Sequence, residues 1–525
     1  MNKLSVGYRR ECITPAIGTY LGGYGNGKDR QTVGKIFEDD DLFVTVIAVT
    51  DENNETILIC TVDSVRMPVM TYGEIIAHLQ ELTGITDEHI ILNATHSHSA
   101  PDIQDGAEYI KTWKALVVEQ AGKAALGALA DRKPAKVFAA VKEVESLNFV
   151  RRYMLNGKFL GTNANGDAHE SAADNHLQIL KFVREGGEDL VLCNWGAHAD
   201  HSKCFGGPEG SETYHRGCSA DYIYSLRKTV EAKTGAKFAF FQAAAGNLNP
   251  VSRIAEEMGR IHGRMEKDDA IRPIAYGREL ADEVIDVLNH PMTELNGGAA
   301  KGTTSSIMAE RAKGPEIGSP EYNRAVALCA VAFARRAIDP PTKESREGAD
   351  FLQEVYEMGT NEDVERMAQD ENDPMHDYAM IVKILRDGGC LGKTSPASHH
   401  AGSKLSKFFQ FNSGLYSAGG LVRHSENNGL PPVELPIHAV SCGDFAFVGA
   451  PGEIFDECGK AVKDASPFKM TFYLELSGGS FGYFPSHRAW ANGGYEVGNT
   501  NFAEGTAEAI AERQLEMLNK LNKEL

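Results

Sequence analysis

The sequence contains no long hydrophobic run. The longest aliphatic stretch near its start, FVTVIAV (43–49), is of strand length and falls far short of the roughly 20 residues that a membrane-spanning helix needs. The first residues, MNKLSVGYRRECITPAIG, also lack the apolar core of a signal peptide. We therefore expect a cytoplasmic protein without a membrane partner.

Closely spaced cysteine pairs are absent as well. Nine cysteines are scattered along 525 residues, and no two of them have the C-x-x-C spacing of zinc ribbons and thioredoxin-like sites. The scatter does not resemble the disulfide framework of a small secreted protein either. The cysteines thus favour a reducing compartment and indicate no cysteine-based metal site.

The sequence has fewer positively charged than negatively charged residues. The chain has 53 Lys and Arg against 73 Asp and Glu, a net charge of −20. Nucleic acids and anionic membranes are bound by clustered cations, so both are disfavoured as partners. We expect a small-molecule substrate, and assembly into a homo-oligomer stays open.

What the sequence does contain is an alternation of strand-like and helix-like segments. Runs rich in β-branched residues at 43–49 and 56–61 precede a helical pattern at 72–82 and a buried-type strand at 90–94. Strand, helix and strand in succession predict a β-α-β unit within a parallel or mixed sheet. The fold class that follows is α/β (α+β), with a mixed sheet core, surrounding helices and an active site in loops at strand ends.

The stretch 297–432 differs from the rest because it is rich in Gly, Lys, Glu and Asp. Strand-like runs return after it at 433–440, 445–448 and 470–476, so both of its flanks suit one sheet-based core. We predict a single domain over residues 1–525, in which 297–432 is an elaborated insertion or lid.

Two histidines directly follow the strand predicted at 90–94, in the segment NATHSHSAP (93–101). His96 and His98 would point to the same side if the strand continued, since strand side chains repeat every second residue. In a loop, one of them can bind a metal and the other a substrate. His-x-His at a strand end is common in metal-dependent hydrolases, and a purely structural loop is the alternative interpretation.

Two further segments place small or polar groups after apolar strands. NWGAHADH (194–201) offers His198, for which a structural histidine bound to backbone is the alternative. QAAAGNLNP (242–250) contains Gly246, whose missing side chain lets the backbone approach a ligand closely. Ligands bind at the carboxyl ends of strands in such sheets, so both segments are candidate parts of one site.

The C-terminal quarter adds three more segments of this kind. VGAPGE (448–453) ends in a carboxylate, and SGGSFGY (477–483) and GGYE (493–496) each offer a tyrosine. Taken singly, the glutamate reads as a solvated turn residue and the tyrosines as ordinary half-buried aromatics. Their shared position after apolar strands favours a site.

Together these motifs resemble the neutral/alkaline ceramidase family. HSHSAP, NWGAHA, QAAAGNLNP, PGE and GY…GGYE follow one another in the order of that family, and the opening GYRRECITPAIGTYLGGYG is similar to the family's start. The resemblance covers about residues 5–250 and 433–500, and 297–432 has no counterpart.

The resemblance implies one zinc ion and a specific set of site residues. The implied metal ligands are His96, His198, Glu453 and Tyr483. The implied catalytic residues are His98, Tyr495 and Arg151, with Arg152 as the alternative to Arg151. The implied substrate-binding residues are Gly246, Asn247 and Asn249.

This set of residue types suits zinc chemistry. Two imidazoles, a carboxylate and a phenolate are ligands for a borderline cation, and water or substrate can take an open position. Water bound to zinc loses its proton at about pH 7 and becomes a nucleophile. His98 would take that proton and give it to the leaving group, while Tyr495 and Arg151 would stabilise the oxyanion. Asp63, at another strand end, is a candidate for orienting a ligand or for capping a helix.

Three departures from the family bear on the substrate. Asn249 stands where the family's hydrolases carry a serine, the stretch 202–219 is polar, and the chain ends about 30 residues after Tyr495, without the family's C-terminal β-sandwich. We predict a zinc-dependent hydrolase that cleaves an amide bond, N-acyl amides included, in a small, polar, soluble substrate. The alternatives are a zinc-dependent lyase, isomerase or glycoside-cleaving enzyme acting on a carbohydrate-like substrate, and a non-catalytic binding protein.

Overall fold

The computed structural model describes the core of the chain. The described residues are 4–23, 31–104, 107–155, 157–162, 167–201, 217–251, 271–322, 325, 365–366, 369–370 and 419–523. Among them, no helix combines the length and the apolar character needed to cross a membrane.

A nine-stranded mixed sheet forms the centre of the molecule. Its strands, in spatial order, are β14 (Lys237–Gln242), β12 (Leu190–Trp195), β11 (His176–Arg184), β6 (Lys133–Glu143), β1 (Leu4–Cys12), β3 (Phe43–Thr50), β4 (Thr56–Val62) and β5 (Ile90–Ala94), with β16 (Thr293–Leu295) paired to β6. The pairs β12–β14 and β4–β5 are parallel, and the other pairs are antiparallel. The predicted mixed sheet is confirmed.

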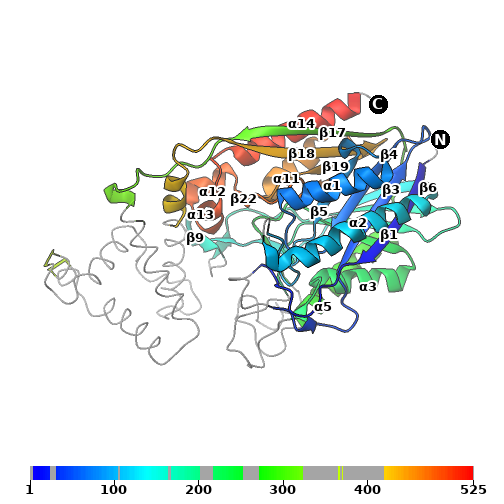
Figure 1. Cartoon of the computed structure of the whole chain (residues 1–525), viewed down its shortest axis with the longest axis horizontal. Helices are drawn as coiled ribbons and strands as arrows, with labels where there is room; N and C mark the ends of the chain where they lie inside the picture. The colour runs from blue at the N-terminus through cyan, green and yellow to red at the C-terminus, as the bar shows by residue number, and fades with distance from the viewer. Residues whose placement is uncertain are drawn as a thin grey trace.

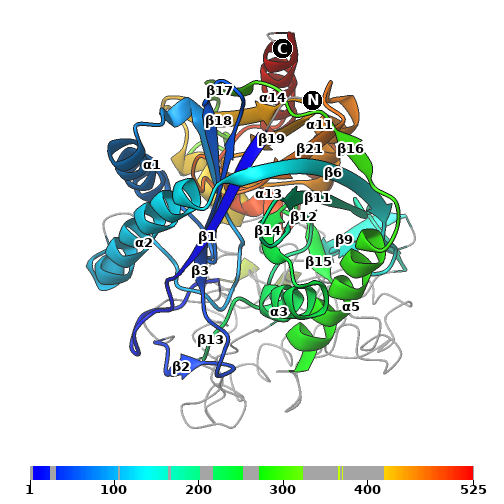
Figure 2. The same ribbon diagram turned by 90° about the vertical axis from the view of Figure 1, so that its right-hand side faces the viewer.

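Helices cover one face of this sheet. They are α1 (Val69–Thr83), α2 (Lys111–Ala130), α3 (Tyr222–Thr234) and α5 (Ile271–Leu288). Their apolar side chains, such as Ile75, Trp113 and Leu280, share one buried cluster with the sheet strands. In Figure 2, α3 and α5 lie below the arching strand β6, and β19 (Phe445–Gly449) and β21 (Met470–Leu474) of the second sheet lie above it.

A second, four-stranded sheet packs on the opposite face. It consists of β17 (Ala300–Ala309), β18 (Val433–Cys442), β19 (Phe445–Gly449) and β21 (Met470–Leu474) in that order, covered on its outer face by α11 (Asp456–Ala465) and α14 (Thr506–Lys523). Phenylalanines fill the space between the two sheets, among them Phe182, Phe241 and Phe447. Each such ring contributes about 1.5–3 kcal/mol by leaving water.

The described chain also contains short elements. They are β2 (Gly34–Lys35), η2 (Asp87–His89), η3 (Glu108–Ile110), β7 (Asn148–Val150), β8 (Arg152–Leu155), β9 (Lys158–Thr162), β10 (Ala168–His169), β13 (Gly217–Cys218), β15 (Leu248–Pro250), β20 (Glu453–Ile454), β22 (Tyr483–Phe484), α12 (His487–Asn492) and α13 (Tyr495–Asn499). β22 and α13 lie at the end of the sheets away from both chain termini (Figure 1).

The predicted insertion 297–432 begins inside the core. Its first strand, β17, pairs with β18 along ten positions, so this part of the segment belongs to the second sheet. Most of the remainder lies outside the described residues, as does most of the polar stretch 202–219. The lid and the single-domain organisation therefore stay predictions.

Candidate metal centre and active site

Three histidines and a glutamate from distant segments meet at the carboxyl ends of the strands. His96 and His98 follow β5, His198 follows β12, and Glu453 opens β20; we call these four residues the histidine cluster. Glu453 Oε2 lies 3.4 Å from His96 Nε2 and 3.3 Å from His198 Nε2. His98 Nε2 lies 3.1 Å from His96 Nε2, and the ligand atoms of the three histidines all lie within 4.8 Å of one another. The structure thus brings three predicted ligands together with the predicted catalytic histidine.

Backbone carbonyls fix the tautomers of the two predicted histidine ligands. His96 Nδ1 lies 2.7 Å from the carbonyl of Val65, and His198 Nδ1 lies 2.8 Å from that of Ala245. A carbonyl only accepts hydrogen bonds, so both Nδ1 atoms carry a proton, and both Nε2 atoms face Glu453. His198 Nε2 and Glu453 Oε2 are buried, and among the described residues they make no hydrogen bond. A cation satisfies such converging acceptors, so this donor set fits a divalent metal.

His96 occupies a strained turn that directs its ring into the cluster. Its φ of 63° falls in the left-handed region, where a side chain costs about 1–2 kcal/mol. The bond to Val65 and near-complete burial hold the residue there. Residues kept in this region concentrate at functional sites.

Burial and neighbouring charges set the protonation of the cluster. Burial lowers the pKa of His198 to about 4, helped by the Arg151 cation, and burial with the nearby His96 and His198 holds the pKa of His98 well below its usual range. Burial would also lower the pKa of His96, but the nearby negative charge of Glu453 outweighs burial and raises that pKa. Burial would raise the pKa of Glu453, but the two imidazoles hold it well below its usual range. His98 is therefore neutral and able to accept a proton.

Tyr483, the fourth predicted ligand, is the neighbour of Glu453. Strands β20 and β22 are parallel, with Glu453 opposite Tyr483. Burial raises the pKa of Tyr483 well above its ordinary value, so a phenolate at this position depends on nearby cations. Arg151 supplies one, because its Nη2 donates to the Tyr483 hydroxyl at 3.1 Å.

Arg151 stands between the predicted ligands and the predicted substrate side. Its buried guanidinium donates to four groups: Glu496 Oε1, the Gly246 carbonyl, Asn249 Oδ1 and the Tyr483 hydroxyl. It also lies 5.7 Å from the centre of the Tyr495 ring, which meets the Tyr483 ring edge-on at 5.5 Å. Arg152, the alternative, instead binds Glu170 and Glu496. Of the two arginines, Arg151 is the one beside the predicted ligands.

The GNLNP loop divides into residues that face Arg151 and one that fastens the loop. A side chain on Gly246 would come within 2.5 Å of the Glu453 carbonyl, so only glycine fits there. Asn249 Oδ1 accepts from Arg151 at 3.4 Å. The amide of Asn247, by contrast, binds Asp456 twice, at 2.7 and 2.9 Å, and ties the loop to α11. Contact of these three residues with substrate stays a prediction.

The suggested role of Asp63 is wrong. Its Oδ2 accepts from both terminal nitrogens of Arg227 and from the backbone N–H of Phe43, each at 3.0 Å. It caps no helix either, since Pro68 precedes α1. Arg227, which pairs with this carboxylate, lies 164 positions away in the chain. A local sequence pattern cannot reveal such a pair.

Several residues of the site escaped the sequence pattern. Gly23 packs against His98, since a side chain there would come within 2.6 Å of the ring; the paired glycines of LGGYG were its signal. Glu496, next to the predicted Tyr495, binds both Arg151 and Arg152. The backbone carbonyls of Val65 and Ala245 orient the predicted ligands His96 and His198, and a backbone group leaves no mark in the sequence.

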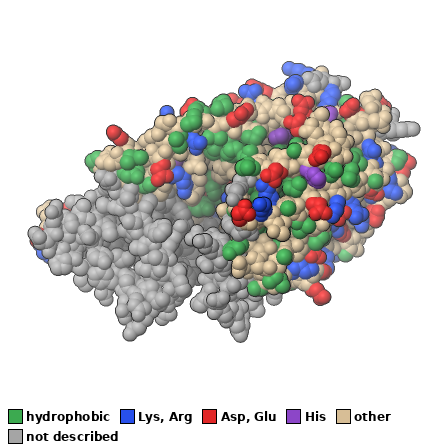
Figure 3. Space-filling view, in the orientation of Figure 1, with side chains coloured by type: hydrophobic (Ala, Val, Ile, Leu, Met, Phe, Trp, Pro, Cys, Tyr) green, Lys and Arg blue, Asp and Glu red, His purple; other side chains and the backbone are tan. Residues whose placement is uncertain are grey.

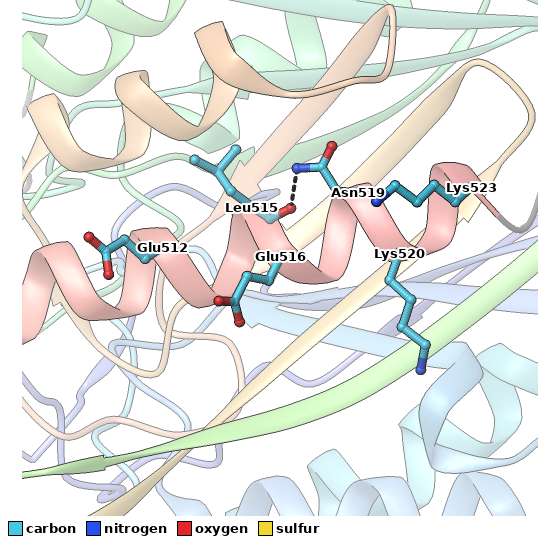
Figure 4. A pocket seen from close by; sticks show the side chains of 6 residues that line it. All are labelled: Glu512, Leu515, Glu516, Asn519, Lys520 and Lys523. Carbon is cyan, nitrogen blue, oxygen red and sulfur yellow. Dashed lines mark hydrogen bonds between the residues drawn. The ribbon is translucent and has the colours of Figure 1, made fainter.

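Two other described parts of the surface do not bring polar side chains from distant segments together in this way. A hollow of 760 Å³ runs along α14, lined by Glu512, Leu515, Glu516, Asn519, Lys520 and Lys523. Figure 4 shows that all six come from one helix, and Asn519 already donates to the Leu515 carbonyl. On the face in Figure 3, Lys and Arg alternate with Asp and Glu over the described residues.

Comparison with known proteins identifies the fold. No protein-family model matches the chain, and no curated protein matches it in sequence. Two solved structures are similar over the whole chain. A neutral ceramidase from Pseudomonas aeruginosa has a TM-score of 0.63 at 14% identity, with 75% of its own length covered. A ceramidase complexed with C2 has a TM-score of 0.62 at 16% identity, with 76% covered. The resemblance seen in the motifs therefore holds for the architecture, and this chain has a neutral ceramidase-like fold.

Proposed function

We propose that this protein is a zinc-dependent hydrolase that cleaves an amide bond in a small, polar substrate. The observation that carries the proposal is the convergence of His96, His198 and Glu453 acceptors beside the neutral His98. The similar solved structures are ceramidases, and ceramidase activity is the hydrolysis of an amide, which supports this reaction over the carbohydrate chemistries.

Four side chains would hold the metal: His96, His198, Glu453 and Tyr483. Two imidazoles with a carboxylate and a phenolate suit zinc better than the harder Mg²⁺ or Ca²⁺, which prefer oxygen ligands alone. A bound zinc ion would polarise the substrate carbonyl and bring the pKa of a bound water toward neutrality.

His98 would move the proton. Burial keeps its imidazole neutral, and its Nε2 lies within the cluster, 3.1 Å from His96 Nε2. In this position it accepts a proton from the attacking water and returns it to the amine that leaves. The three-histidine geometry also allows His98 to be a ligand, and the metal content of a His98→Ala variant distinguishes the two roles.

Arg151 and Tyr495 would stabilise the negative charge that develops on the carbonyl oxygen. The arginine is buried and fixed by Glu496 and the Gly246 carbonyl, so its charge is already oriented before substrate binds. Asn249 places an amide against the same guanidinium, which supports a substrate with hydrogen-bonding groups near the scissile bond.

A screen of N-acyl amides tests the proposal. Zinc-loaded protein is incubated with N-acyl amino acids, N-acyl amino sugars and a short-chain ceramide, and released primary amine is measured with an amine-reactive dye. We expect release from a polar N-acyl substrate and none from the His98→Ala variant. No amine from any amide, together with cleavage of a glycoside panel, would reject amide hydrolysis.

A further inference from the structure

A buried glutamate that the proposed function does not use lies next to the histidine cluster. Glu475 directly follows β21 and is fully buried. Its Oε2 accepts a hydrogen bond from the backbone N–H of Ala245 at 2.9 Å. Its Oε1 is buried and makes no hydrogen bond within the described part of the chain. Removing a carboxyl from water for a single hydrogen bond is costly, so core packing alone does not account for this residue.

Ala245 connects this glutamate to the predicted ligand His198. The N–H of Ala245 binds Glu475, and its carbonyl accepts from His198 Nδ1 at 2.8 Å. That second bond, with a longer contact of 3.1 Å from His198 Nδ1 to the Leu248 carbonyl, fixes the tautomer in which Nε2 faces Glu453. Outer partners that orient a ligating histidine are worth about 10- to 100-fold in metal affinity.

The backbone around Glu475 is also joined to the turn that presents Glu453. Ala450 donates to the carbonyl of the last residue of β21 at 2.8 Å, and Leu476 donates to the Gly452 carbonyl at 3.2 Å. Glu475 therefore spans the space between the loop that orients His198 and the turn that carries Glu453.

We propose that Glu475 is a positioning residue for the metal centre, which holds His198 in its ligating orientation through the backbone of Ala245. The inference rests on the metal site of the proposed function and is independent of the bond that is cleaved. This positioning role requires a side-chain oxygen that can reach the Ala245 N–H and accept its hydrogen bond, and it requires no negative charge. Burial raises the pKa of Glu475 to about 8, so a neutral acid agrees with this requirement.

Two conservative variants separate reach from charge. Glu475→Gln keeps the length and an acceptor oxygen but has no charge, whereas Glu475→Asp keeps the acid and is one methylene too short. Asp51→Ala is the control for lost stability, because buried Asp51 also binds backbone N–H groups, at the β3–β4 turn at the opposite ends of the strands. Zinc affinity is measured by competition with a fluorescent chelator, and thermal stability is measured without metal.

We expect Glu475→Gln to bind zinc like the wild type and Glu475→Asp to bind about 10- to 100-fold more weakly. The visible spectrum of the Co²⁺-substituted protein should change in the Asp variant only, while Asp51→Ala should lower the melting temperature and leave zinc affinity unchanged.

Wild-type affinity in Glu475→Asp would overturn the inference, whether or not Glu475→Gln is weakened. If Glu475→Gln binds zinc more weakly while Glu475→Asp binds it like the wild type, the negative charge and not the side-chain length sets the zinc affinity. Wild-type protein that binds no zinc in the same titration would instead remove the proposed function itself, so the two failures are distinguishable.

Discussion

Two buried groups of charged side chains lie side by side at the carboxyl ends of the strands, and their polar atoms are satisfied in opposite ways. In the arginine network, formed by Arg151, Arg152, Glu170 and Glu496, no buried side-chain nitrogen or oxygen of these four residues lacks a hydrogen bond. In the histidine cluster, acceptors of His198 and Glu453 face each other at 3.3 Å without a donor.

The difference indicates which group is scaffold and which is reactive. Satisfied buried charges fix a geometry, because breaking one pair leaves its partner uncompensated. Converging acceptors, in contrast, are stable only with an added cation or proton. Tyr483 joins the two groups, since it pairs with Glu453 in the strand register and accepts from Arg151.

The largest effect is expected at His98, the proposed acid–base. His98→Ala should lower the hydrolytic rate by about 10²- to 10⁴-fold, because a positioned acid–base is lost, while bound zinc is retained. The matched control is exposed His290→Ala, which should change neither. Loss of zinc from His98→Ala would instead indicate that His98 is a metal ligand.

Glu496 tests the arginine network. Glu496→Gln should lower the free energy of unfolding by about 3 kcal/mol, because two buried arginines each lose a charged partner. Urea denaturation of metal-free protein measures this loss, with exposed Glu512→Gln on α14 as the control. A change below 1 kcal/mol would show that the network is not the scaffold.

Glu453 tests the opposite property, stabilisation by the metal. Free zinc at 100 times its Kd should stabilise the wild type by about 2.7 kcal/mol, because the ion binds only the folded chain. Glu453→Gln should lose most of this increment, whereas Glu496→Gln should keep it on a lower baseline. Urea denaturation with and without zinc measures the stabilisation by the metal. An equal gain in unfolding free energy in both variants would show that the histidine cluster and the arginine network do not differ in this property.

The smallest effect concerns a buried carboxyl outside both groups. Burial raises the pKa of Asp40 to about 7, against the opposing charge of Arg227 and with a small rise from Asp63. Because the folded pKa exceeds the unfolded one, its contribution to stability is complete below about pH 4 and is lost as pH rises through 7.

Asp40→Asn should flatten that decline, since the amide keeps the oxygen that accepts from the Ala220 N–H. Urea midpoints between pH 5 and 8 should fall less in the variant than in the wild type. Parallel curves would show that Asp40 does not titrate in this range.

The sequence was sufficient for those parts of the fold and site that depend on local pattern. Strand-to-loop motifs placed His96, His98, His198 and Glu453 after the carboxyl ends of strands, which is the edge of a sheet where ligands bind. The mixed sheet followed from the alternation of strands and helices.

The parts that escaped depend on contacts between distant segments. Asn247 meets Asp456 across 209 positions, and Ala245 meets Glu475 across 230. No local spacing encodes such pairs, and a backbone carbonyl that orients a histidine is compatible with any side chain at its position. The sequence pattern therefore identified the predicted ligands, and it did not identify the groups that orient them.

Metal content decides whether the histidine cluster binds an ion. The measurement is elemental analysis of the purified, zinc-equilibrated protein beside the His96→Ala, His198→Ala double variant. We expect one equivalent of zinc in the wild type and none in the variant. Equal metal in both proteins, or none in either, would show that the cluster is not a metal site.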